Sequence, residues 1–215
     1  MNTQSGRSMV EMLGVLAIVG VLSVGAIAGY SKAMMKYKLN KHAEQMNTLI
    51  NAVARNVHSF DNIKTEKNLT AIMVKMGEIP TEMVKGNNSD YIYDIFGQAW
   101  SVFTGSGSSH PVYLSTYNDW GNGGSSVLSS KSADNLAICR NMLITAKENS
   151  ANIYLLVTAS GKLDNNRNEQ VLYGDAPCGY RNTCLKNITL DDIYRICTSH
   201  TGASKSVVFE IQWLR

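Results

Sequence analysis

The feature that most constrains this chain is an apolar run from Met9 to Tyr30, which contains one charged residue, Glu11, in twenty-two positions. As a helix that rises 1.5 Å per residue, the run would span about 30 Å, the thickness of the hydrocarbon core of a membrane. A carboxylate in mid-bilayer costs up to about 3 kcal/mol, so Glu11 is either a functional residue or a helix-end residue that reaches the headgroups. The run therefore predicts one membrane helix.

Downstream of Tyr30 the hydrophobic pattern becomes that of an amphipathic helix, with apolar residues spaced by three and four positions. These residues are Leu39, Ala43, Met46, Ile50, Val53 and Val57. The opposite face is polar and is expected to face solvent or a neighbouring subunit; it holds Lys38, Lys41, Glu44, Gln45, Asn51 and Arg55. The pattern predicts one unbroken helix that continues from the apolar run to about His58.

The composition excludes several classes of protein. In 215 residues, 44% are hydrophobic and 17% charged, which excludes a disordered polyelectrolyte, and a net charge of +3 is too small for a nucleic-acid footprint. The four histidines, His42, His58, His110 and His200, cannot be tied to a nucleophile and an acid. The glycine-rich stretches 105–109 and 121–126 lack the spacing of phosphate loops and are expected to be turns. We therefore expect no enzymatic activity and no cofactor.

Four cysteines, Cys139, Cys178, Cys184 and Cys197, allow three disulfide connectivities, and none has the CxxC spacing of a zinc or redox site. The short loop between Cys178 and Cys184 carries Gly179 and can close on itself, which favours that pair and leaves Cys139 to meet Cys197. A Cys139 to Cys178 link stays open as an alternative. Disulfides require an oxidising compartment, which places the C-terminal part outside the cytoplasm.

Basic residues give the opposite orientation, because four lysines follow the apolar run and only Arg7 precedes it. A bare count of these charges would place the C-terminal side in the cytoplasm. The two orientation signals conflict.

The remaining sequence predicts an α+β head, with an antiparallel sheet laid on the second half of the long helix. Short helices are predicted at 69–76 and at 189–197, the latter opened by Thr189 with Asp192 three residues later. An inserted helix over 132–148 would carry Cys139, with Ser132 or Asp134 as its N-cap. Strands are predicted from alternation and aromatic or β-branched content: 98–104, 111–117, 152–158, 170–173 and 206–213.

Four residues have part of the pattern of a calcium loop. They are Asp164, Asn166, Asn168 and Asp175. Glu169 stands at the sixth position, where such a loop needs glycine. We expect no metal there, and these residues are kept only as a weak calcium candidate.

The first residues carry a resemblance. Gly6, then four residues, then Glu11, then an unbroken apolar run, resembles the class III leader of type IV pilins and type II secretion pseudopilins. The resemblance implies that a prepilin peptidase cuts after Gly6, that Arg7 becomes the methylated N-terminus, and that Glu11 acts in assembly. It also implies that the short leader stays inside and the head lies outside, which removes the conflict over orientation.

The resemblance implies four segments: a leader over 1–6, a transmembrane and filament-core helix over 7–30, its amphipathic continuation over 31–60, and a globular head over 61–215. The string from Ile79 into the strand at 98–104 is similar to the region that joins helix and sheet in type IVb pilins. A Cys139 to Cys197 bond is similar to the one that bounds the variable region of pilins. The sequence departs from many of these proteins at Arg7, where an apolar residue is common, and at Ala28, where a proline kinks the helix.

The expected function is that of a structural subunit of a type IVb-like pilus. The alternatives are a minor pilin or a secretion pseudopilin, and, from another class, a membrane-anchored extracytoplasmic binding domain. The expected partners are other copies of the chain, the prepilin peptidase and the assembly machinery of the inner membrane; nucleic acid is not expected. Before assembly the chain would cross the inner membrane once, and afterwards it would belong to an extracellular filament or a periplasmic pseudopilus.

Overall fold

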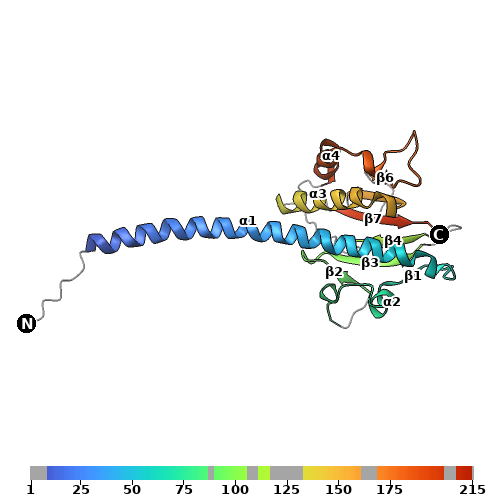
Figure 1. The fold of residues 1–215 in the computed structure, drawn as a ribbon, viewed down its shortest axis with the longest axis horizontal. Coiled ribbons are helices and arrows are strands. Elements are labelled where there is room, and N and C mark those ends of the chain that lie inside the picture. The colour runs from blue at the N-terminus through green and yellow to red at the C-terminus, as the bar shows by residue number, and fades with distance from the viewer. Residues whose placement is uncertain are drawn as a thin grey trace, which may run out of the picture. The chain divides into compact units, whose positions relative to one another are not determined.

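The computed structural model describes residues 9–86, 90–105, 111–116, 133–160, 169–200 and 207–214 (Figure 1). The chain divides into two compact units, Met1–Lys38 and Leu39–Arg215. Helix α1 runs from Met9 to Asn56 and is followed by a 3₁₀ turn, η1, at Val57–Phe60. The prediction of one helix to about residue 58 is therefore confirmed for the described part.

The second unit contains three further helices: α2 at Thr70–Lys75, α3 at Ala133–Glu148 and α4 at Leu190–His200. Short 3₁₀ turns lie at Thr81–Met83 (η2), Ser150–Asn152 (η3) and Leu185–Asn187 (η4). The strands are β1 (Lys67–Asn68), β2 (Ile92–Tyr93), β3 (Ala99–Thr104), β4 (Val112–Ser115), β5 (Leu155–Ser160), β6 (Glu169–Tyr173) and β7 (Val207–Trp213).

All these strands pair antiparallel in one sheet, with the order β1-β3-β4-β7-β5-β6 and β2 added beside β3. Strand β7 lies between β4 and β5, so Ile211 is opposite Leu114 on one side and Leu156 on the other. The α+β class is thereby confirmed, with a long helix, an antiparallel sheet and two disulfides.

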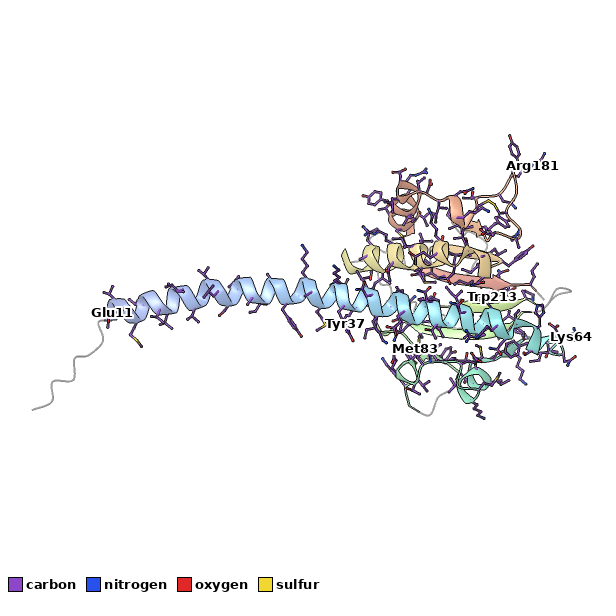
Figure 2. The ribbon with its side chains drawn as sticks, in the orientation of Figure 1. Glu11, Tyr37, Lys64, Met83, Arg181 and Trp213 are labelled. Carbon is purple, nitrogen blue, oxygen red and sulfur yellow. A yellow bond between two sulfur atoms is a disulfide. The ribbon has the colours of Figure 1, made fainter. Side chains whose placement is uncertain are left out.

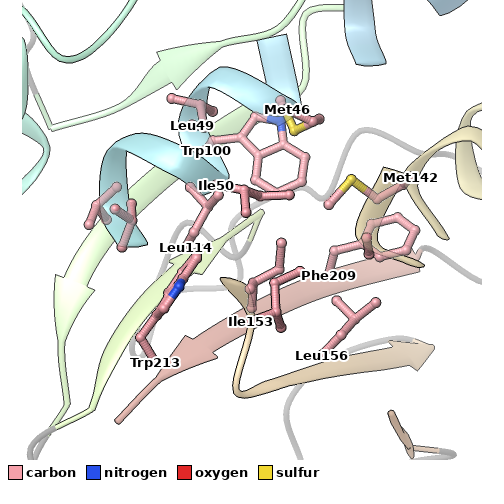
Figure 3. Packing of buried hydrophobic residues seen from close by; sticks show 14 of the residues in the cluster. Met46, Leu49, Ile50, Trp100, Leu114, Met142, Ile153, Leu156, Phe209 and Trp213 are labelled. Carbon is pink, nitrogen blue, oxygen red and sulfur yellow. The ribbon is translucent and has the colours of Figure 1, made fainter. Parts of the chain in front are cut away.

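The core of the second unit lies between the sheet and two helices, α1 and α3. Figure 3 shows Met46 and Ile50 of α1 around Trp100 of β3, and Met142 of α3 beside Phe209 of β7; all five side chains are buried. The spacing of Met46, Leu49, Ile50 and Val53 is that of one helical face, which explains why this part of α1 packs against a sheet.

Each predicted strand coincides with an observed one, with ends shifted by up to three residues. The largest shift is at β5, which begins at Leu155 because Ser150–Asn152 form the turn η3. The α4 cap is confirmed: the Asp192 amide donates to Thr189 Oγ1 at 3.1 Å, and the Thr189 amide donates to Asp192 Oδ2 at 2.9 Å. Asp134 lies inside α3 and is therefore not its N-cap, while Ser132 lies outside the described residues.

The predicted polar face of the second half of α1 is wrong at Gln45, which is buried with 3% of its surface exposed. Its Oε1 accepts a hydrogen bond from the Ile95 amide at 2.9 Å, so the side chain satisfies a backbone group fifty residues away. Burial without that partner would cost free energy.

Two disulfides join Cys139 to Cys197 and Cys178 to Cys184, the pairing that the short 178–184 loop favoured. The first connects α3 to α4, and the second closes the loop that follows β6.

Candidate assembly and membrane site

The first unit presents an apolar helix surface that no described residue covers. Every side chain from Met9 to Tyr30 is exposed. Met9 is 80% exposed, Val21 75% and Ile27 66%, so the exposed side chains are not confined to one face (Figure 2). Within the described chain, this is the one helix long and apolar enough to cross a membrane, by length and composition only.

Exposure of this apolar surface to water costs free energy, so the helix requires an apolar environment. Burial of a large apolar side chain is worth about 1.5–3 kcal/mol, and a helix that is apolar on all sides is stable only in lipid or among other apolar helices. The helix is continuous through Gly14, Gly20, Gly25 and Gly29, and an added Cβ would meet nothing within 4 Å at any of them. The surface is therefore uninterrupted over its whole apolar length.

Glu11 is exposed and lies in the first described turn of α1, where the positive end of the helix dipole favours a carboxylate. Figure 2 shows it at the described start of the helix. Gly6 and Arg7, the predicted processing residues, lie outside the described residues. The structure thus places one charged side chain on the apolar surface.

A buried polar cluster in the second unit joins α1 to α3 and to the turn between β2 and β3. Asp94 is 2% exposed; its Oδ1 accepts from the amides of Phe96 and Gln98 at 2.8 and 2.9 Å, and its Oδ2 accepts from Trp100 Nε1 at 3.0 Å. Gly97 makes the turn possible with a φ of 80°. The carboxylate therefore organises the β2–β3 turn.

His42 of α1 completes the cluster and is fully buried, which the sequence pattern did not reveal. Its Nδ1 lies 3.0 Å from Asn141 Nδ2, which also donates to the Leu39 carbonyl at 2.9 Å. Nδ1 must therefore accept, and the ring proton is assigned to Nε2, 3.5 Å from Asp94 Oδ2. Burial lowers the pKa of His42, and the Asp94 charge opposes this effect only in part.

The groups of this cluster are held in place by hydrogen bonds to one another and to the backbone. Asp94 already accepts three hydrogen bonds, and the bond from Asn141 fixes the imidazole in one tautomer. His58 is exposed and lies 3.7 Å from Asp61, while His110 and the side chain of His200 lie outside the described part of the chain. Among the described side chains, His42 and His58 do not approach a nucleophile.

The calcium candidates fall mainly outside the described residues, which include Asp175 but not Asp164, Asn166 or Asn168. Asp175 Oδ1 lies 3.7 Å from Lys186 Nζ, so its described neighbour is a cation. Within the described residues, no group of three or more His, Cys, Asp or Glu side chains could hold a metal ion.

Comparisons of the chain with protein-family models, with curated proteins and with solved structures gave no match.

Proposed function

We propose that this chain is a structural subunit of a type IVb-like pilus, a membrane-anchored protein that assembles through its N-terminal helix and has no enzymatic activity of its own. The observation that carries the proposal is the helix from Met9 to Tyr30, which is exposed on all sides and bears one charge, Glu11. The spacing from Gly6 to Glu11 supports processing by a prepilin peptidase.

The proposed mechanism follows from the cost of charges in an apolar medium. After cleavage behind Gly6, each subunit would have a positively charged amine at Arg7 and a carboxylate at Glu11. An isolated charge costs several kcal/mol in a low-dielectric core, and pairing with an opposite charge offsets part of this cost. When a subunit leaves the bilayer, its Glu11 would pair with the amine of a neighbour and set the register between the two helices.

The head supports this role by its covalent and hydrogen-bonded construction. Both disulfides suit an extracytoplasmic compartment, and the buried His42 cluster connects α1 to the rest of the head. A head that holds the second half of α1 firmly can follow the first half into a filament. Minor pilins and secretion pseudopilins would share these features and are the alternatives within the class.

The first prediction concerns processing. Cells that contain a prepilin peptidase should yield a protein that begins at Arg7 with a methylated amine, as measured by intact mass spectrometry. Gly6→Asp should block cleavage, because it changes the residue at the cut, whereas Gly14→Ala should be processed normally, since an added Cβ there meets nothing within 4 Å.

Retention of residues 1–6 in the membrane-resident protein would contradict the pilin proposal. That result would favour the alternative from another class, a membrane-anchored binding domain that keeps its N-terminus.

A further inference from the structure

Helices α3 and α4 enclose a cleft of about 360 Å³ in the second unit, at the end where Leu39 begins the packed part of α1. The walls are largely apolar, with Leu39, Leu136 and Ile144 half-buried and Tyr194 58% exposed. Such a cleft buries apolar groups without needing to open.

Arg140 lines the same cleft and is exposed. None of the ion pairs or hydrogen bonds between described side chains involves its guanidinium, in contrast to Arg55 and Arg195, which pair with carboxylates. A planar guanidinium binds a phosphate through two parallel hydrogen bonds. The cleft therefore combines an apolar interior with an anion-binding group.

A second cavity of about 380 Å³ adjoins the first through Ile144, which lines both, and extends between α3 and α4. Leu190 at its edge is 72% exposed. The charged groups around it are Lys147, Glu148 and Lys186, and Lys186 lies 3.7 Å from Asp175, so these charges balance. Together the two cavities form an apolar groove whose basic group without a described hydrogen-bond or ion-pair partner is Arg140.

We propose that this groove binds an anionic phospholipid, with the phosphate at Arg140 and an acyl chain along the apolar walls. The proposal rests on the membrane anchor of the proposed function. Leu39 follows Tyr30 by nine positions, so chain connectivity alone keeps Leu39 within about 30 Å of the end of the apolar run. If the apolar run is anchored in a membrane, this short connection keeps the head near the lipid headgroups.

Charge and covalent structure both favour this occupant. Lys32, Lys36 and Lys38, between the apolar run and the head, attract anionic headgroups to the same region. The Cys139–Cys197 bond joins the two walls of the cleft, so the site is formed before the lipid arrives and little ordering is needed on binding. Tyr194 has the amphipathic ring that suits a membrane interface.

The test uses the full chain in nanodiscs of phosphatidylcholine with or without phosphatidylglycerol. Tyr194→p-benzoylphenylalanine places a photocrosslinker in the cleft, and Tyr180→p-benzoylphenylalanine places one at a fully exposed position of the 178–184 loop. We expect adducts with phosphatidylglycerol to exceed those with phosphatidylcholine at least fivefold from position 194 only. Arg140→Gln should bring this ratio close to one, and Arg195→Gln, which removes an exposed arginine outside the cleft, should leave it unchanged.

Equal lipid adducts from positions 180 and 194, no adducts, or adducts with a second copy of the chain would each overturn the proposal, the last in favour of a subunit interface. Retention of the protein in the nanodisc reports on the anchor separately. The cleft is also tested without a bilayer, by native mass spectrometry of the micellar protein with dihexanoyl phosphatidylglycerol. Loss of that complex in Arg140→Gln is expected, and its persistence would overturn the assignment of Arg140.

Discussion

His42 makes the stability of the head depend on pH. Its folded pKa is lowered from about 6.5 by burial, so below that pH the unfolded chain takes up a proton that the folded head does not accept. If His42 were protonated inside the folded head, its Nδ1 would carry a hydrogen and would face Asn141 Nδ2, so two donors would oppose each other. Stability from this group is therefore present above pH 6.5 and lost as pH falls.

We predict that the free energy of unfolding decreases as the pH falls from 6.5 towards 5, by no more than about 1.4 kcal/mol per pH unit, which is the contribution of one proton. Urea titration of the micellar protein measures it. His42→Gln should remove most of this dependence on pH, and His58→Gln, at an exposed position, should keep it.

The measurements stay above pH 5 so that three carboxylates do not contribute to the change. Hydrogen bonds with Arg55, Lys41 and Thr189 lower the pKa values of Glu78, Glu82 and Asp192, in that order, so these groups lose their contribution to the free energy of unfolding only in more acidic solution. An unchanged slope in His42→Gln would contradict the explanation.

Glu11→Ala should leave the protein folded and membrane-inserted but defective in joining filaments. Removal of a charge from an apolar helix makes insertion easier, while the amine of the neighbour would remain unpaired in the filament core at a cost of several kcal/mol. Co-expression with the wild-type chain, followed by mass spectrometry of sheared filaments, measures incorporation. Ser23→Ala is the matched control, because Ser23 is exposed on the same helix and bonds only to the Val19 carbonyl. Equal incorporation of the two variants would show that Glu11 is a helix-end residue only.

At the scale of elements, the capping box of α4 makes a measurable contribution to the free energy of unfolding. Thr189→Ala removes the acceptor of the Asp192 amide and should lower the free energy of unfolding by about 1 kcal/mol. Thr198→Ala is the control, since its hydroxyl bonds only to carbonyls within the same helix. Chemical denaturation measures both variants, and equal losses would mean that the cap contributes nothing specific.

The elements that the sequence predicted correctly are those with local causes. The spacing of Met46, Ile50 and Val53 defines one helical face, and Thr189 with Asp192 forms a cap within four residues. The alternation of buried Phe209, Ile211 and Trp213 with half-buried Glu210 and Gln212 in β7 is likewise a local pattern that the sequence shows.

Features that depend on distant partners were not predicted from the sequence. Gln45 and His42 look like surface residues of an amphipathic helix, but Ile95 and Asn141, which bond to them, lie fifty and ninety-nine residues away. The two-residue strands β1 and β2 carry too little pattern to be recognised and exist through pairing with β3. The sequence around Arg140 does not mark it as a binding residue either, because the cleft that it lines is formed with α4, far along the chain.

For the whole molecule, the two disulfides should differ in their effect. Closure of a loop of 58 residues by Cys139 and Cys197 stabilises by about 4 kcal/mol in the chain-entropy model, and closure of 6 residues by Cys178 and Cys184 by about 2 kcal/mol. Paired substitution to alanine and urea titration should reproduce this order. Peptide mapping without reduction should recover both pairs, and a larger loss from the shorter loop would contradict the entropic account.

The place of β7 between β4 and β5 determines when the sheet can be completed during synthesis of the chain. Strands β1 to β4 and strands β5 and β6 have no shared ladder until residues 207–213 arrive. The sheet therefore closes only after residues 207–213 have left the ribosome, long after Met9 to Tyr30 has been made. A chain truncated before residue 207 would therefore keep β1–β4 and β5–β6 as two unjoined pieces of sheet.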